Sequence, residues 1–444
     1  MSRILGVLVA LLLGVAQAAP DEDLLSKASG YPFQRLGPDF SLLPDTYKVG
    51  NFTNMERIFW PREIAASAQP LALTRRSEPF DVTYPFNGRT YTIADILDRQ
   101  RITGLLILKG DTIVYEAYQY DRKPDHKFAS FSMAKTVTAL LVGVALGEGR
   151  IASLDDPAEK YAPDLKDTAY GTVTIRNLLR MTSGAKWSDR VVPGQTSDIA
   201  QLTADTFYRR GRGGAASLQR VRESVAPQGT LFNYSSAETM ALGLALKGAV
   251  GTDLATYASE KLWKPMGAET PASWLTDWSG MESAFCCINA TLRDYGRLGL
   301  LLAADGEVNG KQVVPKEFML DATDPARQPD FLKPRKASQF FGYGFQTWLY
   351  PYHTRTFQAR GLFGQEIIVQ PSSKVVVVIL SALRSPETAS EIFVERNWFV
   401  GQILQALGGR AVPRRFVWNA TLTMATGSRA RWVCGQVACR PVHM

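Results

Sequence analysis

One long apolar stretch, residues 133–146, constrains the fold of this chain more than any other segment. Its composition is typical of a helix, and Lys135 is its single charged side chain. A helix that is apolar on nearly every face belongs in the middle of a domain, because none of its faces is suited to water. The stretch therefore predicts a central helix that carries one lysine into a site walled by apolar side chains.

Ser132 stands directly before this helix, three residues ahead of Lys135. Residues three apart share a helix face, so the two side chains can touch. Desolvation beside the positive end of the helix disfavours the ammonium form and lowers the lysine pKa toward that of a working base. The pair thus predicts a nucleophile with its own base. The same four-residue pattern also fits a helix N-cap followed by a lysine that reaches solvent, so other segments must decide.

The N-terminus predicts export. Arg3 precedes an apolar run over residues 4–16, and the small residues Ala18 and Ala19 follow. This pattern is typical of a secretory signal peptide, residues 1–19, cleaved after Ala18 or Ala19; an uncleaved N-terminal anchor is the alternative. No later stretch of the sequence is long and apolar enough to span a bilayer. We therefore expect a periplasmic or secreted protein without stable membrane insertion after cleavage.

Charge and histidine content argue against several kinds of function. The net charge of +8 is spread along the chain, and no basic motif is interleaved with aromatic residues, so we expect no nucleic-acid partner. His126, His353 and His443 are far apart and have no zinc-ligand spacing, so we expect no metal and no cofactor. The scarcity of histidine and the lack of a Gly-x-Ser-x-Gly elbow also argue against a Ser-His-Asp hydrolase.

Four cysteines invite disulfide pairing in an exported chain. Cys434 and Cys439 flank a short turn that contains glycine, and their pairing is our leading choice. Cys286 and Cys287 are adjacent. For these two, the sequence is equally compatible with a bridge between neighbours and with a pair of buried thiols.

Tyr234 is a second candidate for proton transfer. It ends a loop directly before another apolar, helix-like stretch. Next to an ammonium a tyrosine pKa falls, and a phenolate could take the serine proton or return a proton to a leaving group. The alternative is a half-buried tyrosine whose hydroxyl is simply hydrogen-bonded.

Five segments, in order, resemble the serine β-lactamase and penicillin-binding-protein superfamily, on the side of the class C enzymes, DD-peptidases, lactamase-like esterases and 6-aminohexanoate-dimer hydrolases. They are Phe-Ser-Met-Ala-Lys-Thr at 131–136, residues 178–184, Tyr-Ser-Ser at 234–236, residues 290–302, and residues 342–345 followed by 361–371. The resemblance extends from about Tyr91 to about Ala411.

This resemblance implies roles for named residues. Ser132 would be the acylated nucleophile, Lys135 its partner and Tyr234 a shared acid and base. The backbone N–H groups of Ser132 and Leu362 would form the oxyanion hole. The implied reaction is acyl transfer through an acyl-enzyme that water hydrolyses, with neither cofactor nor metal.

Two departures from the family pattern bear on the substrate. Ser236 replaces the usual Asn and loses an amide that can both donate and accept. Phe363 stands at a commonly basic position, and a phenyl ring cannot pair with a carboxylate. With Gly364 and Gln365, these residues are our candidates for substrate binding. We expect a small-molecule ester or amide substrate; a β-lactamase or DD-peptidase, or a penicillin- or wall-binding protein with little turnover, are the alternatives.

The predicted fold is α/β (α+β): an antiparallel sheet flanked by helices, with an inserted all-helical domain, as in β-lactamases and DD-peptidases. Residues 104–116 predict a hairpin that turns at Gly110-Asp111, and residues 374–380 predict another strand. The parts would be a signal peptide (1–19), an N-terminal extension (20–85), an α/β domain (86–150 and 327–411), a helical domain (151–326) and a C-terminal tail (412–444). The sequence leaves the oligomeric state and the roles of the extension and tail open.

Overall fold

The computed structural model describes residues 21–37, 43–190, 197–385 and 390–411, and three strands nearer the C-terminus. These strands form a small sheet of their own: β17 (Ala420–Thr423), β18 (Arg429–Cys434) and β19 (Cys439–His443). The predicted signal peptide lies outside the described residues. Cys434 and Cys439 stand opposite each other in the β18–β19 register, but their side chains are outside the described part, so this bridge stays a prediction.

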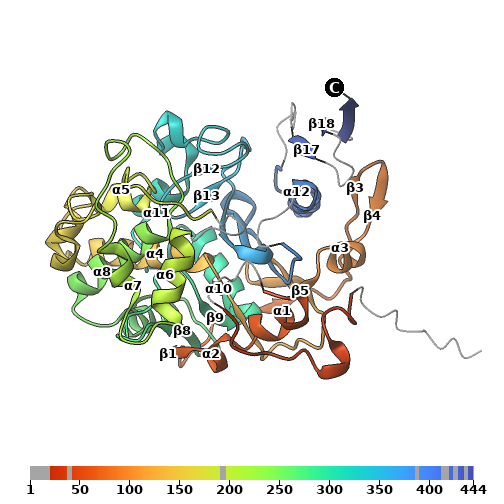
Figure 1. Cartoon of the computed structure of the whole chain (residues 1–444). Helices are drawn as coiled ribbons and strands as arrows, with labels where there is room; N and C mark the ends of the chain where they lie inside the picture. Colours follow the sequence, from red (N-terminus) through yellow and green to blue (C-terminus); the bar gives the residue numbers. More distant parts are fainter. Residues whose placement is uncertain are drawn as a thin grey trace, which may run out of the picture.

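An eight-stranded sheet forms the centre of the molecule (Figure 1). Its strands, in spatial order, are β12 (Gly342–Tyr343), β13 (Trp348–Leu349), β14 (Phe357–Gly361), β15 (Gln365–Gln370), β16 (Val375–Ser381), β5 (Ile102–Lys109), β6 (Thr112–Tyr118) and β2 (Thr74–Arg75). Neighbours are antiparallel except β2, which runs parallel to β6 at one edge. Strands from both ends of the chain therefore share one sheet, which confirms the predicted fold class.

The predicted hairpin is present, because β5 and β6 turn through Gly110 and Asp111, with Gly110 in the left-handed region at φ 58°. The resemblance suggests that residues 342–345 and 361–371 form paired strands, and the structure differs in part. Residues 342–343 pair with β13, while β14 pairs with β15 to form the hairpin beside Ser132. The short strands β12 and β13 thus lie at the sheet edge.

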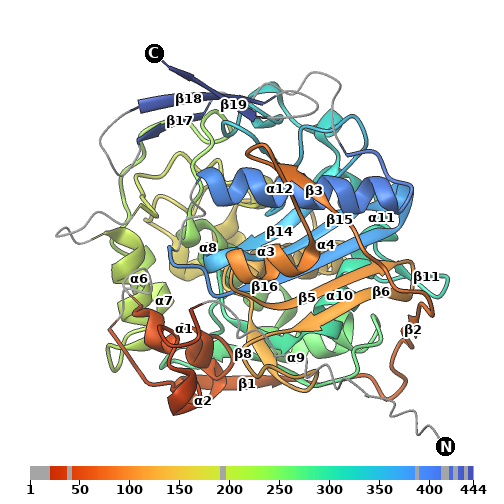
Figure 2. The ribbon, with the colours of Figure 1, turned by 90° about the vertical axis from the view of Figure 1, so that its right-hand side faces the viewer.

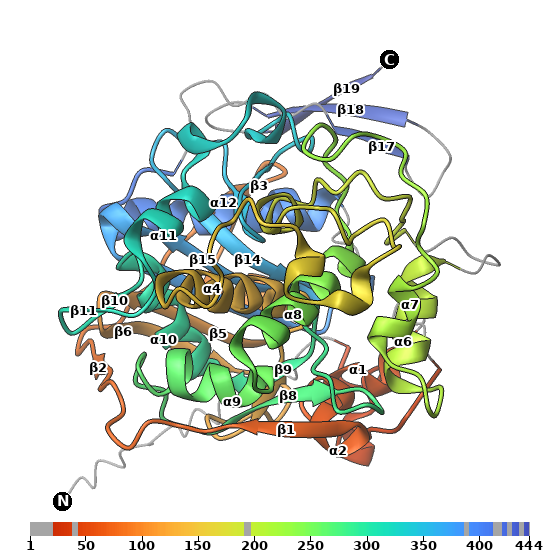
Figure 3. The same cartoon turned by 90° about the vertical axis from the view of Figure 1, so that its left-hand side faces the viewer.

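Helices cover both faces of this sheet, which is why the central strand β16 is apolar on both faces from Val375 to Leu380. Val375 and Val377 face one cluster of buried side chains, and Val376 and Val378 face the other. One face packs against α3 (Ile93–Arg99) and α12 (Ser390–Ala406), seen in front of the strands in Figure 2. The other face packs against α4 (Met133–Gly147) and α10 (Leu292–Ala303), seen in Figure 3.

Helix α4 is the predicted central helix. All of its residues from Met133 to Ala145 are buried, including Lys135. It lies between the sheet and a group of helices that contains α5 (Ile175–Leu179), α6 (Asp198–Phe207), α7 (Gly214–Leu218), α8 (Ser236–Val250), α9 (Leu254–Ala258) and η5 (Ser259–Trp263). The apolar α8 packs directly on α4. A further helix, α11 (Lys316–Thr323), packs on α4 through Phe318, which leaves no room for a side chain at Gly143.

The N-terminal extension contributes to a second sheet. It forms α1 (Asp45–Phe52), α2 (Met55–Ile58) and β1 (Trp60–Ile64). The second sheet has the order β1, β8 (Ala272–Thr276), β9 (Ile288–Thr291) and β7 (Lys127–Ala129). Since β7 ends three residues before Ser132, this sheet sets where the nucleophile turn begins.

Two small hairpins complete the strands: β3 (Tyr84–Phe86) with β4 (Arg89–Tyr91), and β10 (Glu307–Val308) with β11 (Lys311–Gln312). Within the described residues, none of the helices has both the length and the apolar character needed to cross a membrane.

Close packing of α10 on the sheet gives a stability prediction. A Cβ added at Gly299 would lie 2.3 Å from Val376 Cγ1 in β16. We expect Gly299→Ala to lower the free energy of unfolding by about 1–3 kcal/mol, measured by urea denaturation. Gly37→Ala is the control, because nothing lies within 4 Å of its added Cβ. A Gly299→Ala protein as stable as the Gly37→Ala protein would contradict this packing.

Candidate active site

Ser132 lies at a sharp turn between β7 and α4. Phe131, directly before it, has φ 44°, a left-handed conformation that is costly for an aromatic residue. The Phe131 carbonyl accepts hydrogen bonds from the Cys287 N–H (3.3 Å) and from the Ser130 hydroxyl (3.0 Å). These bonds hold the turn, and the Ser132 side chain is left half-buried at the start of the central helix.

Lys135 lies one turn further along α4 and is almost completely buried, with 1% of its surface exposed. Its Nζ donates to three oxygens: Ser132 Oγ at 3.0 Å, Ser236 Oγ at 3.1 Å and the Phe285 carbonyl at 3.0 Å. The three partners come from the turn before α4, from α8 and from the segment before β9. The structure therefore brings the predicted Ser132–Lys135 pair into contact.

Burial lowers the pKa of Lys135 to about 8, because the apolar surroundings disfavour the charged ammonium. The negative charge of Asp189 opposes this shift and raises the lysine pKa. At pH 7 about a tenth of the lysine is therefore the neutral amine, the form that can accept a proton, and this share rises steeply toward pH 8.

Ser236 connects Lys135 to Asp189. Its hydroxyl donates to Asp189 Oδ2 at 2.6 Å, and its backbone N–H also donates to this carboxylate. Trp187 Nε1 donates to Asp189 Oδ1 at 2.6 Å and fixes the carboxylate from the other side. Since a hydroxyl has one hydrogen, Ser236 can only accept from Lys135.

These partners orient the lysine. A neutral amine has two hydrogens and one lone pair. The Ser236 oxygen and the Phe285 carbonyl can only accept from it, so they take the two hydrogens. The lone pair is then left facing the Ser132 hydroxyl, which is the direction needed to take its proton.

Tyr234 precedes α8 and is half-buried beside the lysine. Lys135 Nζ lies 5.0 Å from its ring centroid, and the ring stacks on Trp348 at 5.3 Å. Burial raises the pKa of Tyr234 well above its usual range, although an interaction with the Ser132 side chain lowers it in part. This direction is opposite to the expected one, because desolvation outweighs the hydrogen bond with Ser132. At neutral pH the residue is a phenol that can donate a proton.

Gly361, the last residue of β14, lies against the nucleophile turn. A Cβ added there would be 2.3 Å from the Ser130 carbonyl oxygen and 3.2 Å from Ser132 N. Only glycine allows this approach. Leu362 follows directly, and its side chain is 38% exposed. The two backbone segments predicted to form the oxyanion hole are therefore adjacent.

Three predicted substrate-binding residues after Leu362 are buried inside the protein. Phe363 has no exposed surface and packs its ring 5.0 Å from Phe52 and 5.8 Å from Phe131. Gln365 donates its amide to the carbonyls of Leu362, Phe363 and Ser381. Gly364 has φ 85° and directs its carbonyl to the buried Arg396 at 3.1 Å. In this structure these residues support the Leu362 loop and offer little surface to a substrate.

Sequence reasoning missed Asp189 and the Phe285 carbonyl. Neither has a recognisable motif, and both reach Lys135 only through the tertiary fold. A His, Cys, Asp or Glu cluster of three or more that could hold a metal ion does not occur among the described residues.

Comparisons with known proteins identify the family and the fold. The family described as Beta-lactamase matches residues 91–395. The chain is 25% identical to the 6-aminohexanoate-dimer hydrolase of Paenarthrobacter ureafaciens over 332 residues, covering 72% of this chain and 84% of that protein.

Two solved structures extend the comparison. A Bacillus anthracis protein described as a candidate 6-aminohexanoate-dimer hydrolase superposes with a TM-score of 0.72 at 25% identity, covering 82% of this chain and 95% of the other. EstCE1, described as a hydrolase with promiscuous acyltransferase activity, has a TM-score of 0.54 at 17% identity over 71% of this chain and 96% of its own, and shows the shared fold alone.

Electrostatics at Asp189 give a prediction about the lysine. Since the Asp189 charge raises the Lys135 pKa, Asp189→Asn should lower this pKa below about 8. We expect the rate at which a fluorophosphonate labels Ser132 to reach its plateau at a lower pH in this variant. Asp164→Asn, at an exposed carboxylate in the same half of the chain, should leave the profile unchanged. An unshifted Asp189→Asn profile would contradict the assigned coupling.

Proposed function

The chain belongs to the beta-lactamase family and is a beta-lactamase-fold hydrolase similar to 6-aminohexanoate-dimer hydrolase, and we propose that it cleaves an ester or amide through an acyl-enzyme on Ser132. The observation that carries this proposal is the set of contacts of the buried Lys135 amine. Two of its three partners, Ser236 Oγ and the Phe285 carbonyl, can only accept hydrogen bonds, and the third is Ser132 Oγ at 3.0 Å.

In the acylation step, neutral Lys135 takes the proton of the Ser132 hydroxyl as Oγ attacks the substrate carbonyl carbon. The resulting oxyanion accepts hydrogen bonds from the backbone N–H groups of Ser132 and Leu362. This role is supported by the approach of Gly361 to Ser132 N. The carbonyl contacts of Gln365 and Arg396 limit movement of the loop that carries Leu362.

The leaving group then needs a proton. Tyr234 supplies it, because burial keeps this residue a phenol and its ring lies beside Lys135. The lysine, protonated in the first step, returns a proton to Tyr234 as the leaving alcohol or amine departs. Water attacks the acyl-enzyme in the second half of the reaction, with proton transfers in the reverse order, and the carboxylic acid and free Ser132 are regenerated.

The surroundings of the site favour an apolar acyl group. The exposed Leu362 follows Gly361, which lies against the nucleophile turn, and the half-buried Tyr234 ring lies beside Lys135 and stacks on the half-buried Trp348 ring. Position 363 supplies no cation, because Phe363 is buried in the core. We therefore favour neutral esters and linear amides over β-lactams that carry a carboxylate. Similarity to the Paenarthrobacter ureafaciens hydrolase supports the amide part of this choice.

Export is also part of the proposal. It rests on the signal-peptide pattern of residues 1–19 and is supported by a disulfide within the described residues, since such bonds persist in oxidising compartments.

The proposed base predicts a pH dependence. Only the neutral amine can act, so kcat/KM should rise by about tenfold per pH unit below pH 8 and level off above it. The limb should lie near the Lys135 pKa of about 8. Glu238 is the necessary control, because burial also raises its pKa to about 8. Glu238→Gln should keep the limb; its disappearance in this variant would assign the limb to the carboxyl and not to Lys135.

The nucleophile assignment is tested with three substrates: p-nitrophenyl acetate, an uncharged linear amide oligomer and nitrocefin. We expect ester or amide turnover, weak or absent nitrocefin hydrolysis, and a loss of at least about a thousandfold in Ser132→Ala. Mass spectrometry of the trapped acyl-enzyme should place the adduct on Ser132. An adduct on another serine would contradict the proposal. Fast nitrocefin turnover would instead favour the β-lactamase alternative.

A further inference from the structure

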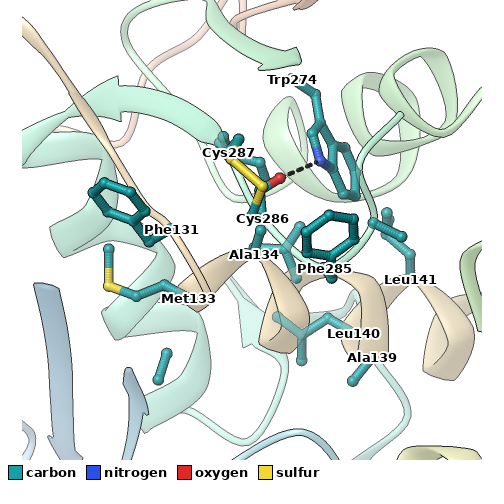
Figure 4. Close-up of a cluster of buried hydrophobic side chains, with 14 of the residues drawn as sticks. Phe131, Met133, Ala134, Ala139, Leu140, Leu141, Trp274, Phe285, Cys286 and Cys287 are labelled. Carbon is teal, nitrogen blue, oxygen red and sulfur yellow. Dashed lines mark hydrogen bonds between the residues drawn. A yellow bond between two sulfur atoms is a disulfide. The ribbon is translucent and has the colours of Figure 1, made fainter. Parts of the chain in front are cut away.

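Adjacent cysteines Cys286 and Cys287 form a disulfide in the segment before β9. This resolves the two alternatives that the sequence left open in favour of a bridge between neighbours. Both side chains are buried, Cys286 at 6% and Cys287 at 0% exposure. Figure 4 shows the bridge over the first turns of α4, close to Phe131, Met133 and Ala134. The bridge therefore lies beside the nucleophile turn although the two segments are far apart in sequence. Lys135 and Phe285, for example, are separated by 150 residues.

The segment around this bridge, residues 284–288, runs along the nucleophile turn and α4 in the opposite direction. The contacts follow in order: Thr138 Oγ1 donates to the Ala284 carbonyl, Lys135 Nζ to the Phe285 carbonyl, Cys287 N to the Phe131 carbonyl, and Ile288 N to Ser130 Oγ. Segment 284–288 thus contacts the residues on both sides of Ser132. It supplies one of the three oxygen partners of the buried lysine.

The contacts on either side of the bridge have fixed directions. The Phe285 carbonyl must point toward Lys135, and the Cys287 N–H must point toward the Phe131 carbonyl. Cys287 adopts φ 75°, a left-handed conformation that non-glycine residues avoid. Phe131, its hydrogen-bond partner, is also left-handed at φ 44°. Two unfavourable conformations therefore face each other across one hydrogen bond beside the nucleophile.

A bond between adjacent cysteines closes a small ring that includes the peptide between them. Such a ring restricts the backbone dihedral angles of both residues more than separate side chains can. Trp274 fixes the ring from behind, because its Nε1 donates to the Cys286 carbonyl at 3.1 Å (Figure 4). The Cys287 carbonyl accepts from Leu275 N at 3.1 Å in the same sheet. This restraint acts directly on the Cys287 N–H, which belongs to the peptide within the ring, and it reaches the Phe285 carbonyl, one peptide earlier, through the fixed position of Cys286.

We propose that the Cys286–Cys287 disulfide is a positioning element of the hydrolytic site, which holds the Phe285 carbonyl on Lys135 and the Cys287 N–H on the Phe131 carbonyl. The inference rests on the proposed function, since it assigns the bridge a role in orienting the Ser132–Lys135 pair. The bridge touches no reacting atom, and its effect reaches the reaction only through these two backbone groups.

The test compares full-length protein produced in an oxidising compartment with two bridge-free variants. Cys286→Ala/Cys287→Ala should lower kcat by about tenfold or more, because misplaced catalytic groups are slow, while KM changes by less than about twofold. Its pH limb should also move to lower pH, since the ammonium loses the Phe285 carbonyl. Cys286→Ala/Cys287→Gly should recover part of kcat, because glycine adopts the left-handed conformation without cost. Cys434→Ala/Cys439→Ala is the matched control and should retain the wild-type kcat and pH limb.

Thermal unfolding distinguishes a purely structural role of the bridge from a positioning role. A purely structural bridge would change the unfolding temperature but would leave the ratio of kcat to KM effects and the pH limb unchanged. If Cys286→Ala/Cys287→Ala does not fold, the folded wild type is reduced with tris(2-carboxyethyl)phosphine, which supplies two electrons and becomes the phosphine oxide while water supplies the two thiol protons. Alkylation and mass spectrometry then show which cysteines have been reduced. Reduced Cys286 and Cys287 should give the same loss of kcat, and the Cys434→Ala/Cys439→Ala protein should respond identically.

The proposal would be overturned if the Cys286→Ala/Cys287→Ala protein, or wild type with this bridge reduced, kept the kcat and the pH limb of the bridged protein. So would alkylation of Cys286 and Cys287 in denatured protein that has not been reduced, because the bridge would then not exist. A failure of the proposed function is recognised separately, since turnover would then persist in Ser132→Ala whatever the state of the bridge.

Discussion

The properties of this site depend on the burial of one amine, that of Lys135. Lys135 is surrounded by apolar side chains of α4 and its neighbours, and its Nζ contacts only neutral oxygens among the partners described above. Water has been removed from the amine without a carboxylate in direct contact, so its pKa falls to about 8. Asp189 is linked to the amine by hydrogen bonds only through Ser236, and its negative charge raises the lysine pKa in part. This balance keeps the amine close to the point where it can accept a proton near neutral pH.

Such a site depends on distant parts of the chain meeting at the start of α4. Two segments outside the helix contact the nucleophile turn. Cys287 N donates to the Phe131 carbonyl, and Gly361, the last residue of β14, lies against Ser130 and Ser132. The N-terminal extension also contributes, because Phe52 packs against the rings of both Phe131 and Phe363. Residues 45–52 thus support the nucleophile turn and the Leu362 loop together, a role that accounts for their place in an otherwise peripheral extension.

The sequence predicts the parts of this molecule that have local signals. The apolar stretch after Ser132, the loop and helix around Tyr234, and the hairpin at Gly110 were all recognisable from periodicity and turn residues. What it could not predict depends on tertiary contacts. Asp189 has no local motif, the raised pKa of Tyr234 comes from burial, and Phe363 was assigned to the substrate when its ring packs in the core. The sequence of strand β1, Trp-Pro-Arg-Glu-Ile, does not alternate apolar with polar residues, and the strand forms by pairing with β8.

Ser236, which stands where the family usually has asparagine, has a different effect on Lys135 because its hydroxyl is bonded to Asp189. An asparagine at this position can donate or accept, so its hydrogen bond to the lysine can run in either direction. Ser236 has given its one hydrogen to Asp189 and can only accept from Lys135. The pair therefore keeps the acceptor that the amine needs and removes the option of donating to its lone pair. Because the Phe285 carbonyl is also an acceptor only, the remaining contact of the neutral amine is directed at Ser132 Oγ. Loss of the amide thus leaves the lone pair of the neutral Lys135 amine directed at Ser132 Oγ.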